Sequence, residues 1–312
     1  MLLILTDAGD RHADAVCGLL DSRQHPYLRL DPAGFPVKLG VSAYIGDVRT
    51  EFVLREITGG RGIDLRSVAA TWYRHPGRPA PDPVPGNREG AGQANHEFLQ
   101  DLWQSMYCRW VPGTPGALRE AGKLHQLVLA SRLGFTVPDT LASNDPGDVL
   151  DFYHLHGGKV IGKRATSSPE TGPGFQARGP TEQVPRYDPS QAGVVRSRPM
   201  IFQALVPRQL DLRITVVGDT VFAAGINSPP ASYRTRYGVH AMPDDVGRLC
   251  RLMVRRMRLV FGVIEMIVTP TGEYVFLGID ANGQYLWIEE ETGLPITSSV
   301  ADLLTRGRRP ET

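Results

Sequence analysis

The chain has few cysteines, and the three that it has lie far apart. Cys17, Cys108 and Cys250 form no CxxC pair and no even-numbered set, which argues against a disulfide framework and against a zinc site. Stable disulfides belong to oxidising compartments. The thiol pattern therefore predicts a protein of the reducing cytoplasm.

The chain also lacks a long hydrophobic run and a strong charge of either sign. No window reaches the roughly 18 apolar residues of a membrane helix, and the N-terminal MLLILTDAGD has no basic segment of the kind that begins a signal peptide. The formal net charge is +1 at pH 7, so no global field favours nucleic acid or a membrane as partner. The arginines between 248 and 258 are interpreted as a solvated helix surface.

The composition is that of a globular protein with more than one core. The chain has 312 residues, of which 41% are hydrophobic and 21% are charged, and this length suits two or three packed subdomains. In residues 1–115, short apolar strands and an amphipathic helix predict an α/β unit, with an antiparallel pair near 38–57 and a helix over about 95–109. A single helix is predicted over 118–133, ended by Gly134.

The second half of the chain is predicted to consist mainly of β-strands. Residues 165–197 are dense in Pro, Gly, Ser and Thr and keep no apolar period, which predicts a long mobile loop, and such a loop in a compact domain is usually either a lid or disordered. Five strand-like runs follow. The segments VVGDTVF and TPTGEYVF predict hairpin turns, and one helix is expected over about 243–259.

The order of these segments resembles a known family. The fragments that carry the likeness include WYRHP, KLHQLVLASRLGF, IFQALVPRQLDLRITVVGD and YVFLGIDANGQYLWIEEETGLPI, and they span nearly the whole chain. Each fragment is weak by itself, but their order and spacing resemble the ATP-grasp ligases. More narrowly, the chain resembles the graspetide synthetases, which crosslink side chains of ribosomally made peptides.

The resemblance implies a fold and a division into three parts. The fold is an α/β ATP-grasp fold, with α+β lobes that hold ATP between them. An N-terminal α/β pre-ATP-grasp domain would cover 1–115. A central lobe, with the mobile loop 165–197 as its lid, would cover 116–200. A C-terminal lobe with an antiparallel sheet and the metal site would cover 201–312.

The resemblance also implies phosphate-binding lysines. Lys163 ends the strand KVIGK, and a lysine there can reach a phosphate as a compact point charge. Lys123 begins a segment that resembles the family's Lys-x-x-Gln-Leu. The alternatives are a snorkelling surface lysine for Lys163 and a solvated helix face for Lys123.

The adenine pocket is expected on the strand IFQALV. Gln203 would lie in the strand that joins the lobes, while Ala204 and Leu205 would contact the base through their backbones. The family often has an acidic residue where this chain has Ala204. The alternative for Gln203 is a sheet residue without a ligand.

Two arginines are candidates for binding phosphate or carboxylate. Arg213 alternates with apolar residues in LDLRITVV and should point to the less apolar face, where a guanidinium can clamp an oxyanion with two hydrogen bonds. The alternative is an ion pair with Asp211 or another carboxylate. Arg234 lies in SYRTR, where Ser232 replaces an acid that is usual in the family.

The family's metal ligands are altered in this chain. The resemblance implies Mg²⁺ bound to oxygen ligands, with phosphates and waters completing an octahedron. Here Glu265 stands where Asp is usual, Gly278 where Glu is usual, and Asp280 where Asn is usual. Asp280 and Asn282 are expected to compensate for Gly278. The alternative for Glu265 is a salt bridge to a nearby arginine.

These expectations combine into one function. The chain is predicted to be an enzyme that uses ATP and Mg²⁺ to activate Asp or Glu side chains of a precursor peptide, with its leader and core, and to join them to Ser, Thr or Lys. The chemical catalysis is assigned to Arg213, Arg234 and Lys163. A homodimer is implied by the resemblance. The alternatives are a non-catalytic relative that binds a peptide or a partner synthetase, and a ligase for free amino acids or carrier-bound substrates.

Overall fold

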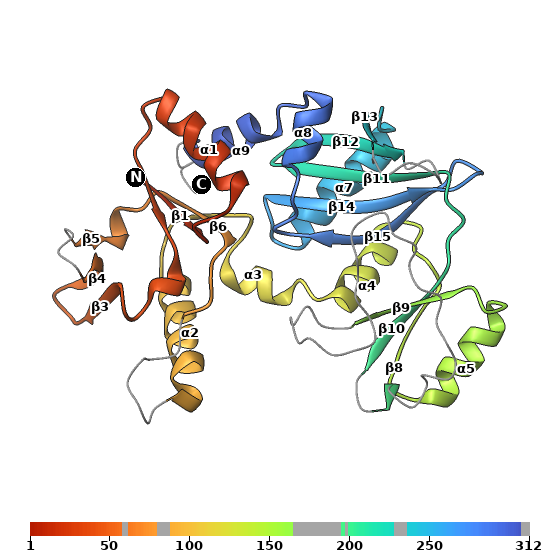
Figure 1. Cartoon of the computed structure of the whole chain (residues 1–312), viewed down its shortest axis with the longest axis horizontal. Helices are drawn as coiled ribbons and strands as arrows, with labels where there is room; N and C mark the ends of the chain where they lie inside the picture. The colour runs from red at the N-terminus through yellow and green to blue at the C-terminus, as the bar shows by residue number, and fades with distance from the viewer. Residues whose placement is uncertain (58–61, 80–87, 165–194, 197–198, 228–235, 307–312) are drawn as a thin grey trace.

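The computed structural model describes residues 1–57, 62–79, 88–164, 195–196, 199–227 and 236–306. Figure 1 shows three groups of elements: an N-terminal group with its own sheets, a five-stranded sheet at the C-terminal side, and a small sheet below it. Helices α3 and α4 run between the first group and the other two. This mixed α/β architecture is the fold class expected from the sequence.

A parallel sheet forms the centre of the N-terminal group. Its strand order is β2-β1-β6-β7, and every neighbouring pair is parallel. The bounds are β1 (Leu2–Thr6), β2 (Tyr27–Leu30), β6 (Ala70–His75) and β7 (Arg109–Val111), with α1 (Arg11–Ser22) after β1. The predicted antiparallel pair is confirmed as β3 (Leu39–Ile45) and β4 (Thr50–Glu56), with β5 (Ile63–Asp64) beside β4. The N-terminal group also contains two short 3₁₀ turns, η1 (Pro32–Gly34) and η2 (Leu65–Ser67).

Two helix predictions were wrong in their bounds. The helix expected over 95–109 is α2 (Arg88–Gln104), and its expected end at 109 lies in strand β7. The single helix expected over 118–133 is two helices, α3 (Pro115–Glu120) and α4 (Lys123–Leu133). The break lies at Gly122, whose extended backbone (φ −66°, ψ 145°) forms the N-cap of α4. Gly134 ends α4 with a left-handed φ of 94°, as predicted.

The small sheet has the order β8-β10-β9 and is antiparallel. Its strands are β8 (Thr140–Ser143), β9 (Val160–Arg164) and β10 (Met200–Ala204), and α5 (Pro146–Leu155) packs on it. Asp145 caps α5 by accepting a hydrogen bond from the N–H of Gly147. Because β10 pairs with β8 and β9, the expected lobe boundary at residue 200 falls at the start of β10.

The C-terminal sheet is antiparallel, in the order β13-β12-β11-β14-β15. Gly218 and Gly272 have φ of 58° and 83° and form the two predicted hairpin turns. The strands are β11 (Leu210–Val217), β12 (Thr220–Asn227), β13 (Arg236–Val239), β14 (Phe261–Val268) and β15 (Tyr274–Asp280). One face of this sheet packs on α4 and on α7 (Asp244–Arg256).

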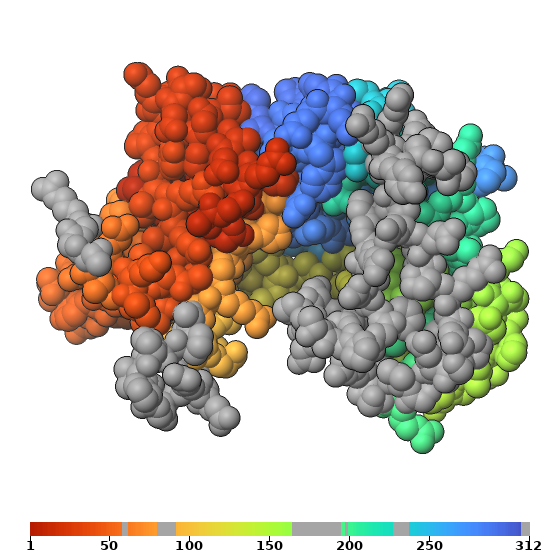
Figure 2. Space-filling view, viewed as in Figure 1, coloured from red at the N-terminus to blue at the C-terminus, as the bar shows by residue number. Residues whose placement is uncertain are grey.

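The last two helices join the N-terminal group to this sheet. Helices α8 (Leu286–Thr292) and α9 (Ile296–Thr305) share one buried core with α1, β1 and β6 on one side and with β11, β12 and β14 on the other. In Figure 2 the olive surface near α3 lies recessed between the N-terminal and C-terminal parts. No helix among the described residues is long and apolar enough to cross a membrane.

Candidate functional site

The face of the C-terminal sheet opposite the one that packs on α7 carries charged residues. On β11, Leu212, Ile214 and Val216 pack into the core with α7, so Arg213 lies on the opposite face, as predicted. Its guanidinium Nη1 donates to Glu265 Oε1 across the strand pair, at 2.9 Å. The interpretation of Arg213 and Glu265 as an ion pair is therefore confirmed. The Glu265 side chain is still 51% exposed, against 10% for Arg213, and can bind a second ligand.

A β-bulge brings Asp280 to the same face. Val263 pairs with Asp280 and Glu265 pairs with Gly278, but Met266 pairs with Phe276, so Leu277 is the extra residue. The bulge reverses which face the following residues occupy. Phe276 therefore stays in the core, whereas Asp280 lies diagonally across from Glu265. Diagonal neighbours in a sheet are about 7–8 Å apart, within reach of two long side chains.

The elbow after β15 is held from the N-terminal group. Asp280 Oδ1 accepts the N–H of Asn282 at 2.9 Å, which closes an Asx turn. The carbonyl oxygen of Asn282 accepts a hydrogen bond from Arg74 Nη1, and Arg74 also reaches Gly283 O at 3.2 Å. His75 Nε2 lies 3.1 Å from the same Asn282 carbonyl. The side-chain Oδ1 of Asn282 is buried without a hydrogen-bond partner.

The donor set of this face fits Mg²⁺ bound together with phosphates. The described part of the chain has no cluster of three or more His, Cys, Asp or Glu residues that by itself holds a metal ion. Glu265 and Asp280 supply two carboxylates, and the unsatisfied Asn282 Oδ1 supplies an amide oxygen. Mg²⁺ commonly binds through one or two carboxylates and substrate phosphates. The arrangement therefore suits a metal that arrives with a nucleotide.

The two predicted lysines approach this face from the other lobe. Burial lowers the pKa of Lys163, the nearby cations of Lys123 and Arg208 lower it further, and the carboxylate of Glu265 partly offsets them. Lys163 lies on β9, and Lys123 is the first residue of α4. The structure thus brings Lys163 close enough to interact with Glu265, and Lys123 lies close enough to interact with Lys163.

The strand of the predicted adenine pocket is buried. Gln203 is 1% exposed, its Nε2 donates to Thr140 Oγ1 at 3.1 Å, and its Oε1 has no partner. The backbone N–H groups of Ala204 and Leu205 donate to the carbonyls of Asp139 and Lys159, at 2.9 and 2.7 Å. A base bound here would displace one of these bonds or use other groups of the strand.

Two further predictions lie outside the described residues. Arg234 falls in the segment 228–235, and the predicted lid covers residues 165–197, of which only Val195 and Arg196 are described.

Comparisons with solved structures match the whole fold. The macrocyclase MdnC from Microcystis aeruginosa MRC, bound with its precursor peptide MdnA, superposes with a TM-score of 0.85 at 25% identity, over 98% of this chain and 99% of that one. The chain is a structural relative of the graspetide synthetases. The macrocyclase MdnB of the same organism gives 0.81 at 28% identity, over 98% and 99%. A RiPP-associated ATP-grasp ligase of Chryseobacterium gregarium, in complex with ADP and a leader and core peptide, gives 0.84 at 25% identity, over 97% and 96%. No family model and no curated protein matches the sequence.

Several residues that shape this site were given no functional role from the sequence, although Asp211 was named as a possible partner of Arg213. Asp211 lies two residues before Arg213 on the same face, and burial raises the pKa of its carboxyl, with Glu265 adding to the rise and Arg208 opposing it. Trp287 places its ring 5.6 Å from the Arg213 guanidinium carbon. The alternation of LDLRITVV carried a signal for Asp211. No local pattern marked Arg74 or Trp287.

Proposed function

We propose that the chain is an ATP-dependent ligase that joins side chains of a ribosomally made precursor peptide. The observation that supports this most is that Lys163 of the small sheet lies close enough to interact with Glu265, which pairs with Arg213 and lies diagonally across from Asp280 on the C-terminal sheet. The likeness to MdnC and to the Chryseobacterium ligase, solved with precursor peptides, gives this face its substrate class.

The roles proposed for the residues of this site follow from their charges. Lys123, Lys163 and Arg213 hold the triphosphate and the peptide carboxylate, with Arg234 assigned to the same task. Gln203, Ala204 and Leu205 form the wall of the base pocket. Glu265, Asp280 and Asn282 would hold Mg²⁺, which when bound neutralises part of the phosphate charge. Positioning and fixed charges supply most of the rate in phosphoryl transfer.

The reaction then proceeds in two steps. A peptide Asp or Glu carboxylate attacks the γ-phosphorus of ATP and becomes an acylphosphate, while the bond between that phosphorus and the β,γ-bridging oxygen breaks and ADP leaves. Arg213 stabilises the developing oxyanion, because a buried guanidinium is already oriented by Glu265 and by the Trp287 ring. A nucleophilic side chain of the peptide then displaces phosphate. Asp211 lies on the same strand face as Arg213 and is paired with Arg208, whose Nη1 lies 3.4 Å from Asp211 Oδ2.

Three finer points belong to the same proposal. The central lobe extends through Ala204, because β10 completes the small sheet. The leader of the peptide binds away from the reacting side chains and raises the effective concentration of the core for successive ring closures. The working unit is a homodimer.

The test uses synthetic peptides copied from any small open reading frame found next to the gene. Purified protein with Mg-ATP should release ADP only when its peptide is present, and the product should be lighter by one water for each new bond. Lys163→Ala should lower turnover by at least about 100-fold. Lys159→Ala, an exposed lysine just before the same strand, is the matched control and should keep wild-type turnover. Tight peptide binding by the wild-type protein without ADP release would instead favour a non-catalytic peptide-binding protein.

A further inference from the structure

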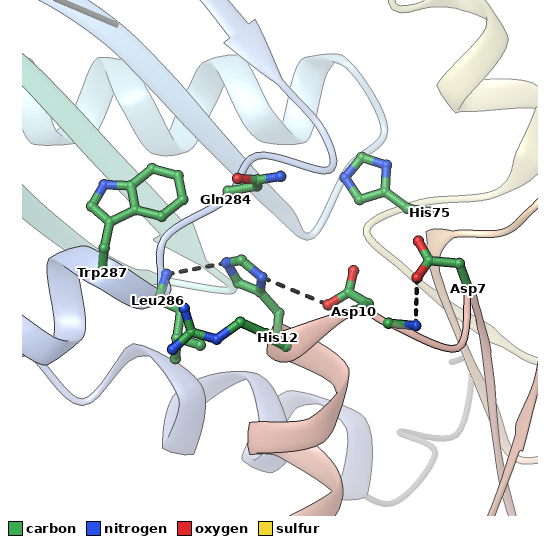
Figure 3. A pocket seen from close by; sticks show the side chains of 9 residues that line it. Asp7, Asp10, His12, His75, Gln284, Leu286 and Trp287 are labelled. Carbon is green, nitrogen blue, oxygen red and sulfur yellow. Dashed lines mark hydrogen bonds and ion pairs between the residues drawn. The ribbon is translucent and has the colours of Figure 1, made fainter. Parts of the chain in front are cut away.

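A second feature lies beside the proposed catalytic face. A pocket of about 500 Å³ opens where the carboxyl ends of β1 and β6 meet the elbow after β15. In open parallel sheets, ligands bind at this edge of the strands. Figure 3 shows Asp7, Asp10 and His75 on one side of the pocket, Trp287 on the opposite side, and Gln284 between them.

The lining of this pocket is acidic. Asp7 follows β1 and is partly exposed, and its Oδ1 accepts the N–H of Gly9 at 2.8 Å. Among the described residues, Asp7 forms no ion pair. The one arginine of the lining, Arg11, is engaged with Glu290 at 3.1 Å, and the buried Asp10 is engaged with Arg74. The pocket is thus left with one uncompensated carboxylate.

The pocket shares a wall with the catalytic face. Trp287 lines the pocket, meets the ring of His12 edge-on at 6.3 Å, and lies 5.6 Å from the Arg213 guanidinium carbon. An occupant of the pocket therefore sits one side chain away from Arg213. Aromatic faces attract cations, by about 0.5–1 kcal/mol at exposed sites.

The charges of the two neighbouring sites are opposite. The proposed catalytic face carries Arg213, with Lys163 close to Glu265, and attracts carboxylate and phosphate. The pocket presents Asp7 and an aromatic wall, and it repels a carboxylate. A neutral hydroxyl would leave the Asp7 charge uncompensated, whereas a primary ammonium matches it.

We propose that this pocket binds the side-chain ammonium of a lysine in the precursor peptide, and that the ring bond formed by this chain is an amide. The inference rests on the proposed ligase function and adds the class of nucleophile. In the bond-forming step the ammonium leaves Asp7 for the neighbouring catalytic face and first gives one proton to solvent. The neutral nitrogen then attacks the acylphosphate carbon, and a C–N bond forms. The C–O bond to phosphate breaks, phosphate leaves with the electron pair, and the second nitrogen proton ends on the phosphate.

Binding of the ammonium can be measured without ATP or the peptide. The probe is Nα-acetyl-lysine methylamide, titrated while the indole N–H signal of Trp287 is followed by NMR, with Trp287→Phe assigning that signal among the four tryptophans. The signal should shift in a saturable way. Nα-acetyl-norleucine methylamide, which has the same shape without the charge, should leave it unchanged. Norleucine methylamide with a free α-amino group distinguishes a chain terminus from a lysine side chain.

Two variants test whether Asp7 is the residue that binds the ammonium. Asp7→Asn keeps an oxygen for the Gly9 N–H and should weaken binding of the lysine probe by about fivefold, as expected for one partly exposed charge pair. Asp47→Asn, an exposed acid in the β3–β4 turn, should change nothing. Equal responses to the lysine and norleucine probes, or tighter binding of the free α-amine, would overturn the inference. If the wild-type protein does not bind Mg-ATP, the proposed ligase function is contradicted, whatever the lysine probe shows.

Discussion

At the scale of single residues, the charge of Lys163 sets a pH limit on nucleotide binding. Burial lowers the pKa of this lysine, so its ammonium is lost at a lower pH than the ordinary value of about 10.4. The protonated form attracts the triphosphate, so Mg-ATP affinity should be full at neutral pH and should fall as pH rises through the lowered pKa. Calorimetric titration of Mg-ATP between pH 7 and pH 10 measures this fall.

The guanidinium of arginine provides the control. Lys163→Arg keeps its charge throughout this range, so its affinity for Mg-ATP should stay level where the wild type declines. A decline of equal size in both proteins would show that another group titrates.

Gly278 offers a second test at this scale. A Cβ at this position would lie 3.6 Å from Gln126 Oε1, an ordinary contact, and the register places it opposite Glu265. Gly278→Glu should therefore fold normally and add a third carboxylate to the face. We expect Mg²⁺-dependent ADP binding to tighten by about tenfold, because a nearby carboxylate adds charge attraction for the metal.

Gly278→Gln separates charge from size. It fills the same space without a carboxylate and should leave the Mg²⁺ dependence close to that of the wild type. If both variants lose nucleotide binding equally, position 278 has no room for a side chain in the bound state, and compensation by Asp280 is the only arrangement that the face permits.

At the scale of elements, Gln126 ties helix α4 to the bulged strand β15. Its Nε2 donates to Ala121 O at 2.8 Å and its Oε1 accepts the N–H of Ile279 at 3.0 Å, with the side chain 6% exposed. Gln126→Leu should lower the free energy of unfolding by about 1–3 kcal/mol, because it leaves a buried N–H unsatisfied. Urea denaturation measures the loss. Ser131→Ala, on the exposed face of the same helix, should fall within about 0.5 kcal/mol of the wild type.

The elements that the sequence predicted well are those with a strong local signal. The alternation of LDLRITVV placed Arg213 on the correct face, and glycine at the turns marked both hairpins. The break between α3 and α4 was missed because the apolar spacing continues across Gly122, while its extended backbone ends the helix. The bulge at Leu277 was missed because a bulge depends on the partner strand, which a single strand's pattern does not report.

The candidate site, too, was predictable only where its residues carry a local sequence signal. Glu265 and Asp280 were found as acids at unusual positions of strands, and the register places them on one face. The contacts that hold this face come from residues far away in the chain, such as Arg74 to Asn282 and His12 to the N–H of Tyr285. Such pairs arise only when separate subdomains pack together, so no local period predicts them.

At the scale of the whole molecule, Arg74 links the N-terminal sheet to the elbow of the proposed metal site. It is 1% exposed, its Nε donates to Asp10 Oδ2 at 3.1 Å, and it contacts the carbonyls of Asn282 and Gly283. Burial tends to raise the pKa of Asp10, but hydrogen bonds from His12 and the Ala13 N–H, together with Arg74, hold that pKa well below its usual range. Asp10 therefore stabilises the fold above its ordinary pKa, and this contribution is lost on acidification.

Arg74→Ala should remove this link between subdomains. It leaves the Asp10 carboxylate buried without its cation, and breaking a buried pair in this way costs about 3–5 kcal/mol of unfolding free energy. The pKa of Asp10 should rise toward its unfolded value, so the loss of stability on acidification should be smaller than in the wild type and should end at a higher pH. Urea denaturation at several pH values measures both effects, and Mg²⁺-dependent ADP binding should weaken because the elbow of Asp280 loses its support.

The matched control is another ion pair between the N-terminal and C-terminal segments. Arg23, the C-cap of α1, meets Asp302 on α9 at 2.7 Å, but the two side chains are 36% and 54% exposed. Exposed pairs contribute about 0–1 kcal/mol, so Arg23→Ala should barely change stability and should leave ADP binding intact. If Arg74→Ala behaves like Arg23→Ala, the N-terminal sheet only packs against the elbow, and the position of Asp280 is set by the C-terminal sheet alone.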